Sequence, residues 1–408
     1  MVKYLTRTAI TIALVWLALS PIACNDNGGS SKPSFVDPTA TLINVENIHL
    51  SELAYVAPFA VLIAGSDGGN SIDIGNKTNV QDNCILDATG GSIGLGEQVI
   101  LAHGATVIGH ASIGEEGECP DGERVCPSFV GFNSEVDGAT IEKDAMVIYL
   151  ARVGPGITIP SGCLVLSGNN ITSQADVGVP PACNPPNTAP VTEALRAFME
   201  GVIEVNVDFA KEYTKLANEG EDNVTGINFD PGNTEFNPNR DLPTLNGVET
   251  RDPEFRNRII GDVRMADTEE MLDLVMGFND SLRADEGEPF EVGNITSMDD
   301  NCTFHALEHT HLQLGNNGTY GFRSLVHGGP TSFPLDGEEP NNTTVTGDNF
   351  TLGEESVFFQ SRIGDNSTVG NKSLVQRVDC PDGTIIGDQR VVVGDGTNCP
   401  LPGTPVQW

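Results

Sequence analysis

The chain has 408 residues, enough for two or three domains. It carries 57 Asp and Glu residues against 21 Lys and Arg, a formal net charge of −36 at pH 7. No nucleic acid partner is expected, because the chain has no basic surface to neutralise phosphates; the acidity fits a solvated surface outside a cell.

The first 24 residues have the layout of an export signal. Lys3 and Arg7 form a basic start, an apolar stretch spans residues 9–20, and PIAC (21–24) is a small-residue end. An apolar stretch this short is typical of a signal peptide and not of a membrane span. The cysteine resembles that of a bacterial lipoprotein signal. We therefore expect a lipid on Cys24, a flexible tether over residues 25–35 and a place in the periplasm or cell envelope.

The alternative is a cleaved signal and a soluble secreted protein. No other run is long and apolar enough to span a bilayer, so membrane contact is expected only through the anchor.

Nine cysteines fit an oxidising compartment. The spacing makes three pairs plausible disulfides: Cys119 with Cys126, Cys163 with Cys183, and Cys380 with Cys399. Cys84 and Cys302 are interpreted as small buried core thiols. No CxxC motif occurs, so a cysteine-based zinc finger is not expected.

Apolar residues recur at steps of six along much of the chain. The runs are Ile74, Val80 and Leu86; Ile93, Val99, Ala105 and Ala111; Ile141, Val147 and Val153; and Ile363, Val369 and Val375. A period of six indicates a β-helix, in which each unit supplies a short strand and a tight turn. Three units close one coil, and coils stack at the ordinary strand spacing. Hexapeptide repeats of this type resemble the left-handed β-helix family.

The rhythm stops between residues 184 and 260. Residues 190–216 instead place apolar side chains at steps of three and four, which predicts an amphipathic helix, with Pro190 suited to its first turn. Residues 217–247 are rich in Asn, Asp, Gly and Pro and indicate a linker. The expected fold is all-β, with two left-handed parallel β-helix domains. The first spans 36–217 and includes the long helix, 218–254 is the linker, and the second spans 255–408 without a comparable helix.

The two expected β-helices look like copies of each other. IGNKTNVQDNCILDA (74–88) can be laid on VGNITSMDDNCTFHA (292–306) without a gap. The second copy carries more polar motifs: LRADEGEPF (282–290), DDNCTFHALEHTH (299–311) and SLVHGG (324–329). Their order resembles the gamma-class carbonic anhydrases, which are trimeric left-handed β-helix enzymes. That family has an R-x-D-E-G turn, a Gln-Asp pair, a zinc histidine followed by A-L-E, and two further zinc histidines five residues apart.

The resemblance assigns different residues to each copy. In the second copy His305 and His327 match the first and last zinc histidines, and Phe322 occupies the place of the middle one. Glu308 matches the A-L-E carboxylate, and the pair reads Asp299-Asp300. The turn of the family is matched by Arg283, Asp285 and Glu286.

The first copy shows the reverse losses. His103 matches the middle histidine, and Gln81-Asp82 keep the pair. Asp87 and Ile108 replace the other two histidines, and only Asp67 of the turn survives.

Neither copy can hold zinc with three histidines, but together they supply one complete set. In the family the first and last histidines come from one subunit and the middle one from its neighbour, and the losses follow that division. His305 and His327 are 22 residues apart, one coil plus a small excursion, which puts them on one face of adjacent coils. We therefore expect a composite metal site of His103, His305 and His327 between the two β-helices.

The resemblance implies zinc-dependent, reversible hydration of carbon dioxide to bicarbonate. Three imidazoles leave one coordination position open, and zinc lowers the pKa of water bound there towards ~7, which yields hydroxide as the nucleophile. Glu308 and Glu286 are candidates for proton transfer to bulk water, and Gln81 for orienting bound water. Asn206 lies nearby if the helix follows the family. Arg283, Asp285 and Asp82 are expected in supporting roles, with Arg283 paired to Asp82 across the interface. Iron(II) or cobalt also suits these ligands.

Other interpretations remain open. The copies could have lost their site and serve as an envelope scaffold or binding module. A hexapeptide-repeat acyltransferase is less consistent with the sequence, because its acyl-CoA donor is absent outside the cytoplasm. His309 and His311 could form a different site with His305. Two copies cannot fill a three-fold ring, so either the two domains pair within one chain or chains combine into a homo-oligomer.

Overall fold

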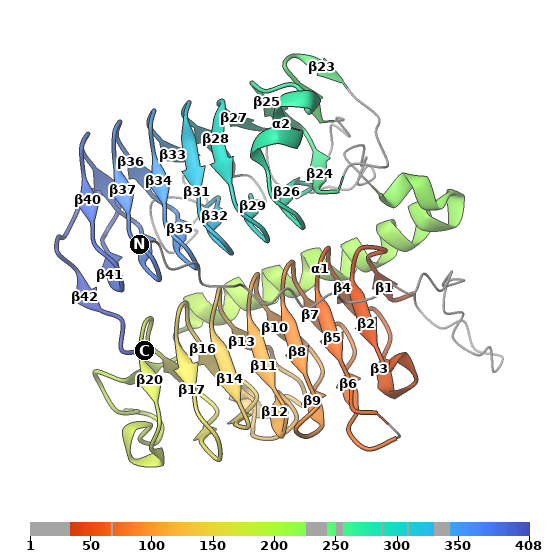
Figure 1. The fold of residues 1–408 in the computed structure, drawn as a ribbon. Coiled ribbons are helices and arrows are strands. Elements are labelled where there is room, and N and C mark those ends of the chain that lie inside the picture. Colours follow the sequence, from red (N-terminus) through yellow and green to blue (C-terminus); the bar gives the residue numbers. More distant parts are fainter. Residues whose placement is uncertain are drawn as a thin grey trace, which may run out of the picture. The chain divides into compact units, whose positions relative to one another are not determined.

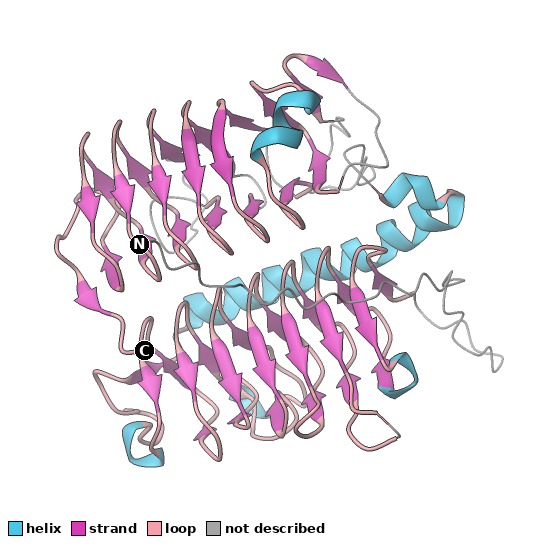
Figure 2. Cartoon of the chain, viewed as in Figure 1, coloured by secondary structure: helices cyan, strands magenta, loops and turns pink. Residues whose placement is uncertain are grey.

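Short parallel strands of two to four residues account for most of the regular structure. The computed structural model describes residues 33–66, 68–225, 243–249, 256–286, 289–307, 310–329 and 343–408. Along most of each copy, every strand pairs with the strand three places earlier and three places later in the chain, so that three strands make one coil and equivalent strands of successive coils form a sheet. This is a parallel β-helix, as the six-residue period predicts. Figures 1 and 2 show two such stacks of coils.

The first β-helix has three sheets, named A1, B1 and C1. Sheet A1 contains β1 (Phe35–Val36), β4 (Tyr55–Val56), β7 (Asn79–Val80), β10 (Val99–Leu101), β13 (Ser128–Val130), β16 (Met146–Val147), β19 (Cys163–Val165) and the antiparallel β21 (Thr188–Pro190). Sheet B1 contains β2 (Thr41–Ile43), β5 (Val61–Ile63), β8 (Ile85–Asp87), β11 (Thr106–Ile108), β14 (Glu135–Asp137), β17 (Arg152–Val153) and β20 (Asn170–Ile171). Sheet C1 contains β3 (Ile48–Leu50), β6 (Ile72–Ile74), β9 (Ile93–Leu95), β12 (Ala111–Ile113), β15 (Thr140–Ile141) and β18 (Thr158–Ile159).

The second β-helix has sheets A2, B2 and C2, where the same letter marks the equivalent place in the aligned copies. Sheet A2 contains β28 (Ile295–Met298), β31 (Gly318–Tyr320), β34 (Thr351–Leu352), β37 (Thr368–Val369) and β40 (Ile385–Ile386). Sheet B2 contains β24 (Arg258–Gly261), β26 (Ser281–Ala284), β29 (Thr303–His305), β32 (Leu325–His327), β35 (Val357–Phe359), β38 (Leu374–Gln376), β41 (Arg390–Val393) and the antiparallel β42 (Thr404–Pro405). Sheet C2 contains β22 (Thr244–Leu245), β23 (Val248–Glu249), β25 (Val263–Met265), β27 (Phe290–Val292), β30 (His311–Leu314), β33 (Thr343–Thr346), β36 (Arg362–Ile363) and β39 (Asp379–Cys380).

The expected linker, 218–254, lies largely outside the described residues. Of its described residues, 218 and 219 end the long helix and Glu221–Val224 form a 3-10 turn. Near the other end β22 pairs with β25, so these residues extend the second β-helix.

Each β-helix encloses its own apolar core. In sheet B1, Leu86, Val107 and Val136 are cross-strand neighbours that face inward and are fully buried. Phe304 and Val326 occupy the same inward places in sheet B2. Because side chains alternate along a strand, the residues on either side of these face outward. The outward residues therefore decide what each sheet packs against.

The long helix covers sheet A1. Helix α1 (Glu193–Glu219) begins after Thr192, whose hydroxyl accepts a hydrogen bond from the Leu195 amide. The predicted start at Pro190 is three residues early, because this proline ends β21 instead of opening the helix. The outward column Ile100, Phe129, Met146 and Leu164 packs with Met199 and Ile203 of α1. Burial of apolar residues on both sides explains why the helix lies there.

Sheet A2 has a polar outward column in the same place. Its residues are Ser297, Thr319, Thr351, Thr368 and Ile385. These side chains offer no continuous apolar surface for a helix to pack on. Among the described residues of the second β-helix, the α-helix is α2 (Glu269–Val275), which has seven residues.

The two β-helices contact each other directly. The corner that follows sheet A1 meets sheet B2: Asn83 Nδ2 donates to Thr303 Oγ1 over 2.9 Å, and Arg323 Nη2 donates to the Gly104 carbonyl over 2.6 Å. Apolar residues of both β-helices and of α1 also share one core cluster. Pairing within one chain, which the sequence left open, is thus present.

The structure contains the three disulfides suggested by spacing. Cys119 bonds to Cys126, Cys163 to Cys183, and Cys380 to Cys399. Cys84 and Cys302 are buried free thiols. Among the described residues, no helix is long and apolar enough to cross a membrane. Cys24, the expected signal and residues 25–32 of the expected tether precede the described residues. The tether prediction is wrong at its end, because Phe35 is buried and begins β1.

Candidate metal centre

Two of the predicted ligands lie on adjacent strands. His305 ends β29, His327 ends β32, and the two residues are cross-strand partners. Their neighbours Phe304 and Val326 face the core, so both imidazoles leave the outer face of sheet B2. The 22-residue spacing therefore spans one coil of the β-helix.

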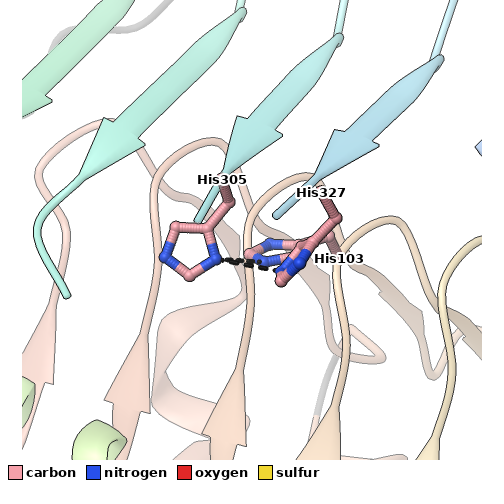
Figure 3. Close-up of side chains that lie close together, drawn as sticks. All are labelled: His103, His305 and His327. Carbon is pink, nitrogen blue, oxygen red and sulfur yellow. Dashed lines mark hydrogen bonds between the residues drawn. The ribbon is translucent and has the colours of Figure 1, made fainter. Parts of the chain in front are cut away.

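The third predicted ligand comes from the first β-helix. His103 lies in the corner that follows β10, next to Gly104. Gly104 has a positive φ of 72°, and a Cβ there would lie 2.0 Å from Asn133 Oδ1, so only glycine fits. This corner carries the His103 imidazole to the two histidines of sheet B2 (Figure 3).

The ring nitrogens converge on one point. His103 Nε2 and His327 Nε2 each lie 3.1 Å from His305 Nδ1, and the three nitrogens lie within 4.8 Å of one another. Tetrahedral coordination with bonds of 2.0–2.1 Å separates nitrogen ligands by about 3.3 Å. Each imidazole is at most 2% exposed. The spacing and the burial both suit a single small cation.

The outer ring nitrogens fix which nitrogen faces the centre. His327 Nδ1 lies 2.8 Å from the Gly328 carbonyl, which can only accept, so Nδ1 carries the proton and Nε2 keeps its lone pair. His103 Nδ1 lies 3.0 Å from Asp82 Oδ2, where the negative charge favours a proton on Nδ1, although the contact lacks the geometry of a hydrogen bond. His305 Nε2 lies 2.9 Å from Glu286 Oε1 and 3.4 Å from Asp285 Oδ1. Metal-binding histidines are held by outer partners of this kind.

The charges around the rings leave one positive charge among the three histidines. Burial lowers the pKa of His103 to about 4, although Asp82 opposes this shift. Burial and the two neighbouring imidazoles hold the pKa of His327 well below its usual range. Burial also disfavours a charged His305, but Glu286 and Asp285 raise its pKa to about 9. Without a metal, the His305 ring is therefore a cation, and the proton on its Nδ1 lies where the lone pairs of the other two rings converge.

One buried arginine joins the outer partners. Arg283 Nη1 donates to Asp82 Oδ2 over 2.5 Å, and Arg283 Nε donates to Asp285 Oδ2 over 2.8 Å. Burial opposes ionisation of both carboxyls, but Arg283 outweighs it and holds the pKa of Asp82 well below its usual range and that of Asp285 at about 2. Both carboxylates therefore stay charged. Arg283 links Asp82 behind His103 to Asp285 behind His305, across the two β-helices.

A small cavity of about 20 Å³ adjoins the histidines. Such a space accommodates roughly one water molecule. Its polar lining includes Gln81, Glu286, His305 and His327, and its apolar wall includes four phenylalanines, Phe129, Phe132, Phe198 and Phe359. The site thus combines a few polar groups with an apolar wall of aromatic rings.

The remaining predicted residues have different positions. Asn206 is buried in α1, and its amide donates to the Val202 carbonyl; Val202 and Phe198 are the helix residues that reach the cavity. Glu308 and Asp67 lie outside the described residues. His309 does too, and His311 bonds to Thr343 instead of joining the three histidines.

Sequence reasoning missed several residues of the site. Asn79 is fully buried with neither amide atom hydrogen-bonded, and it lies on the outward side of β7, two residues before Gln81. An unpaired buried amide is rare enough to mark a functional candidate. The sequence feature that could have identified Asn79 is a polar residue in an outward column whose other residues are apolar. Phe132 and Tyr213 were also missed, because in the sequence they cannot be distinguished from aromatic residues of the apolar core.

The chain is similar in sequence to known proteins. No protein-family model matches the chain. A carbonic anhydrase from Methanosarcina thermophila is 26% identical over 206 residues, which cover 45% of this chain and 74% of that protein. The carboxysome assembly protein CcmM from Nostoc sp. is 27% identical over 184 residues, which cover 42% of this chain and 29% of that protein.

Two solved structures are also similar. A hexapeptide transferase family protein from Anaplasma phagocytophilum has a TM-score of 0.31 and 21% identity, covering 44% of this chain and 91% of that one. An acetyltransferase-like protein from Bacillus cereus has a TM-score of 0.24 and 19% identity, covering 46% and 94%. At these TM-scores the description of the fold depends on the strand pairing in this chain. The sequence likeness, together with that pairing, supports a gamma-carbonic-anhydrase-like left-handed β-helix fold for this chain.

Proposed function

We propose that this protein hydrates carbon dioxide reversibly, with zinc held by His103, His305 and His327 between its two β-helices. The observation that supports this most directly is the convergence of three inner ring nitrogens, with 3.1 Å contacts, from both copies of the repeat. The likeness to a carbonic anhydrase supports the choice of reaction. Iron(II) and cobalt(II) suit the same nitrogen ligands.

The chain's own residues have distinct roles in this proposal. Bound zinc supplies a Lewis acid that makes a water nucleophile available near neutral pH. Gln81, whose side chain lines the cavity, orients water there through its amide. Glu286, whose carboxylate lies on the cavity wall, accepts a proton there in this proposal, and Glu308 is proposed to pass it to bulk water. The phenylalanine rings exclude further water and favour a small apolar substrate.

The cellular setting is also a proposal. We infer export to a bacterial periplasm or envelope, with Cys24 as the lipid attachment point, from the signal-like layout of residues 1–24. There the substrate pair would be dissolved carbon dioxide and bicarbonate.

Metal content and stopped-flow carbon dioxide hydration test the proposal together. The purified protein should hold one zinc per chain and hydrate carbon dioxide. His103→Ala should lose both properties, whereas His110→Ala should keep them, because His110 lies in the same stretch but is exposed. Stoichiometric zinc in His103→Ala would contradict the composite site.

An inactive scaffold is the second candidate, and the likeness to a carboxysome assembly protein favours it. Zinc at one per chain without measurable hydration would support that alternative. The two measurements therefore separate a metal-binding scaffold from an enzyme.

A further inference from the structure

Helix α1 carries a tyrosine that contacts the second β-helix behind the metal centre. Tyr213 is 2% exposed, and its hydroxyl donates to Asp285 Oδ2. The helix follows the first β-helix in the chain, whereas Asp285 belongs to the second. This hydrogen bond therefore joins the two copies at a point not occupied by a predicted ligand.

Asp285 stands between this tyrosine and a metal ligand. Its Oδ2 accepts from both Tyr213 and Arg283 Nε, and its Oδ1 lies 3.4 Å from His305 Nε2. With Oδ2 held by two donors, Oδ1 is the oxygen that faces the imidazole. The orientation of the carboxylate thus determines whether Oδ1 faces the outer nitrogen of His305 beside Glu286 Oε1, which lies 2.9 Å from the same nitrogen.

The hydroxyl is a dependable donor. Burial, reinforced by Asp285, raises the pKa of Tyr213 well above its usual value, so the group stays protonated. Its ring stacks on Phe209 with centroids 5.2 Å apart, which fixes the direction of the O–H group. Arg283 alone is a less specific anchor, because it also binds Asp82.

We propose that Tyr213 is a positioning residue for the metal ligand His305. It acts through Asp285: its hydroxyl holds the carboxylate in the orientation that presents Oδ1 to His305 Nε2, so that Nδ1 faces the metal. This deepens the proposed function and depends on metal binding there. Outer partners of metal-binding histidines contribute about 10–100-fold to affinity. Because Tyr213 acts one residue further out, we expect about tenfold weaker zinc binding in Tyr213→Phe.

The fold supplies a matched control. Tyr55 belongs to the same aromatic cluster, is equally buried and has a hydroxyl without a hydrogen-bond partner. Tyr55→Phe removes the same atom from the same environment without touching Asp285. An effect that comes from removing a buried hydroxyl group from this aromatic cluster, and not from breaking its contact with Asp285, would appear in both variants.

The experiment measures Zn²⁺ affinity by chelator competition and the visible spectrum of Co²⁺, both added to full-length protein freed of metal. Tyr213→Phe should bind Zn²⁺ about tenfold more weakly and change the Co²⁺ spectrum, whereas Tyr55→Phe should stay within about twofold of the unmodified protein. The double variant Tyr213→Phe/Asp285→Asn should bind no more weakly than Asp285→Asn, because both changes affect one contact.

Equal behaviour of the two tyrosine variants, or additive losses in the double variant, would overturn the proposal. A Tyr213→Phe variant that is less stable but has unchanged affinity and spectrum would also overturn it. A protein that binds neither ion overturns both this proposal and the proposed function. Tight binding without carbon dioxide hydration overturns the proposed enzyme alone and leaves the role of Tyr213 supported by the affinity series.

Discussion

Replacing Asp82 with Asn tests the buried charge network that connects the two β-helices. Asp82 is fully buried and contacts Arg283 at 2.5 Å, Ser281 at 2.6 Å and His103 at 3.0 Å. An asparagine has the same shape but no charge, and its amide group presents donors to a guanidinium that also donates. Breaking a buried ion pair in this way costs about 3–5 kcal/mol of folding stability.

The same substitution should weaken metal binding. His103 Nδ1 loses its charged acceptor, so its ring is no longer held with Nε2 towards the centre. Loss of such a partner lowers metal affinity about 10–100-fold. Chemical denaturation of metal-free protein measures the first effect, and chelator competition with Zn²⁺ measures the second.

The internal repeat provides the control for this prediction. Asp300 occupies the place of Asp82 in the second copy, but it is exposed and accepts a hydrogen bond only from the Phe278 amide among the side-chain contacts of the described residues. An asparagine keeps that acceptor, so Asp300→Asn should change stability by less than about 0.5 kcal/mol. The reasoning is refuted if Asp82→Asn behaves like Asp300→Asn in both assays.

Three further predictions concern pH, the chain end and the helix start. Glu286 and Asp285 raise the pKa of His305 to about 9 against the opposing effect of burial, so zinc must displace a proton from His305 below that pH. The affinity for zinc should therefore fall about tenfold between pH 8 and pH 7. An affinity that does not change with pH in calorimetry would contradict this. Deleting residues 406–408 removes the hydrogen bonds of Gln407 to Gly168 and of Trp408 to Leu150, which join the two β-helices. The deletion should weaken Zn²⁺ binding although no predicted ligand changes. Unchanged affinity would show that the remaining interface is sufficient. Thr192→Ala should lower the free energy of unfolding by about 1 kcal/mol through loss of the helix cap, with metal affinity unaffected, and urea denaturation would show no change if the cap were unimportant.

The coil architecture was predictable from local pattern. Apolar residues six apart, such as Ile93, Val99 and Ala105, lie on successive sides of one coil. The pattern requires only that each of these side chains pack on the equivalent side chain of the next coil. The same applies to α1, whose apolar stripe has the helical period. Its start was misplaced because Pro190 and Thr192 are both acceptable at a helix start, and pairing of β21 with β19 decided between them.

The three candidate metal ligands were also suggested by the sequence, through the complementary losses of the two copies. His103 is separated from His305 by more than 200 residues, however, and no local rule brings them together. Their meeting depends on packing between the corner after β10 and sheet B2, which involves apolar side chains from both β-helices and α1.

The sequence by itself thus determined the repeating coils, the long helix and the set of histidines, because each follows from periodic burial or from residue identity. Only the tertiary structure decided which ring nitrogen faces the centre, how Arg283 joins Asp82 to Asp285, and that Tyr213 stands behind them. These features depend on directional hydrogen bonds between segments far apart in the chain. Apolar periodicity specifies that a face is buried, but it does not specify which polar atom meets which across that face.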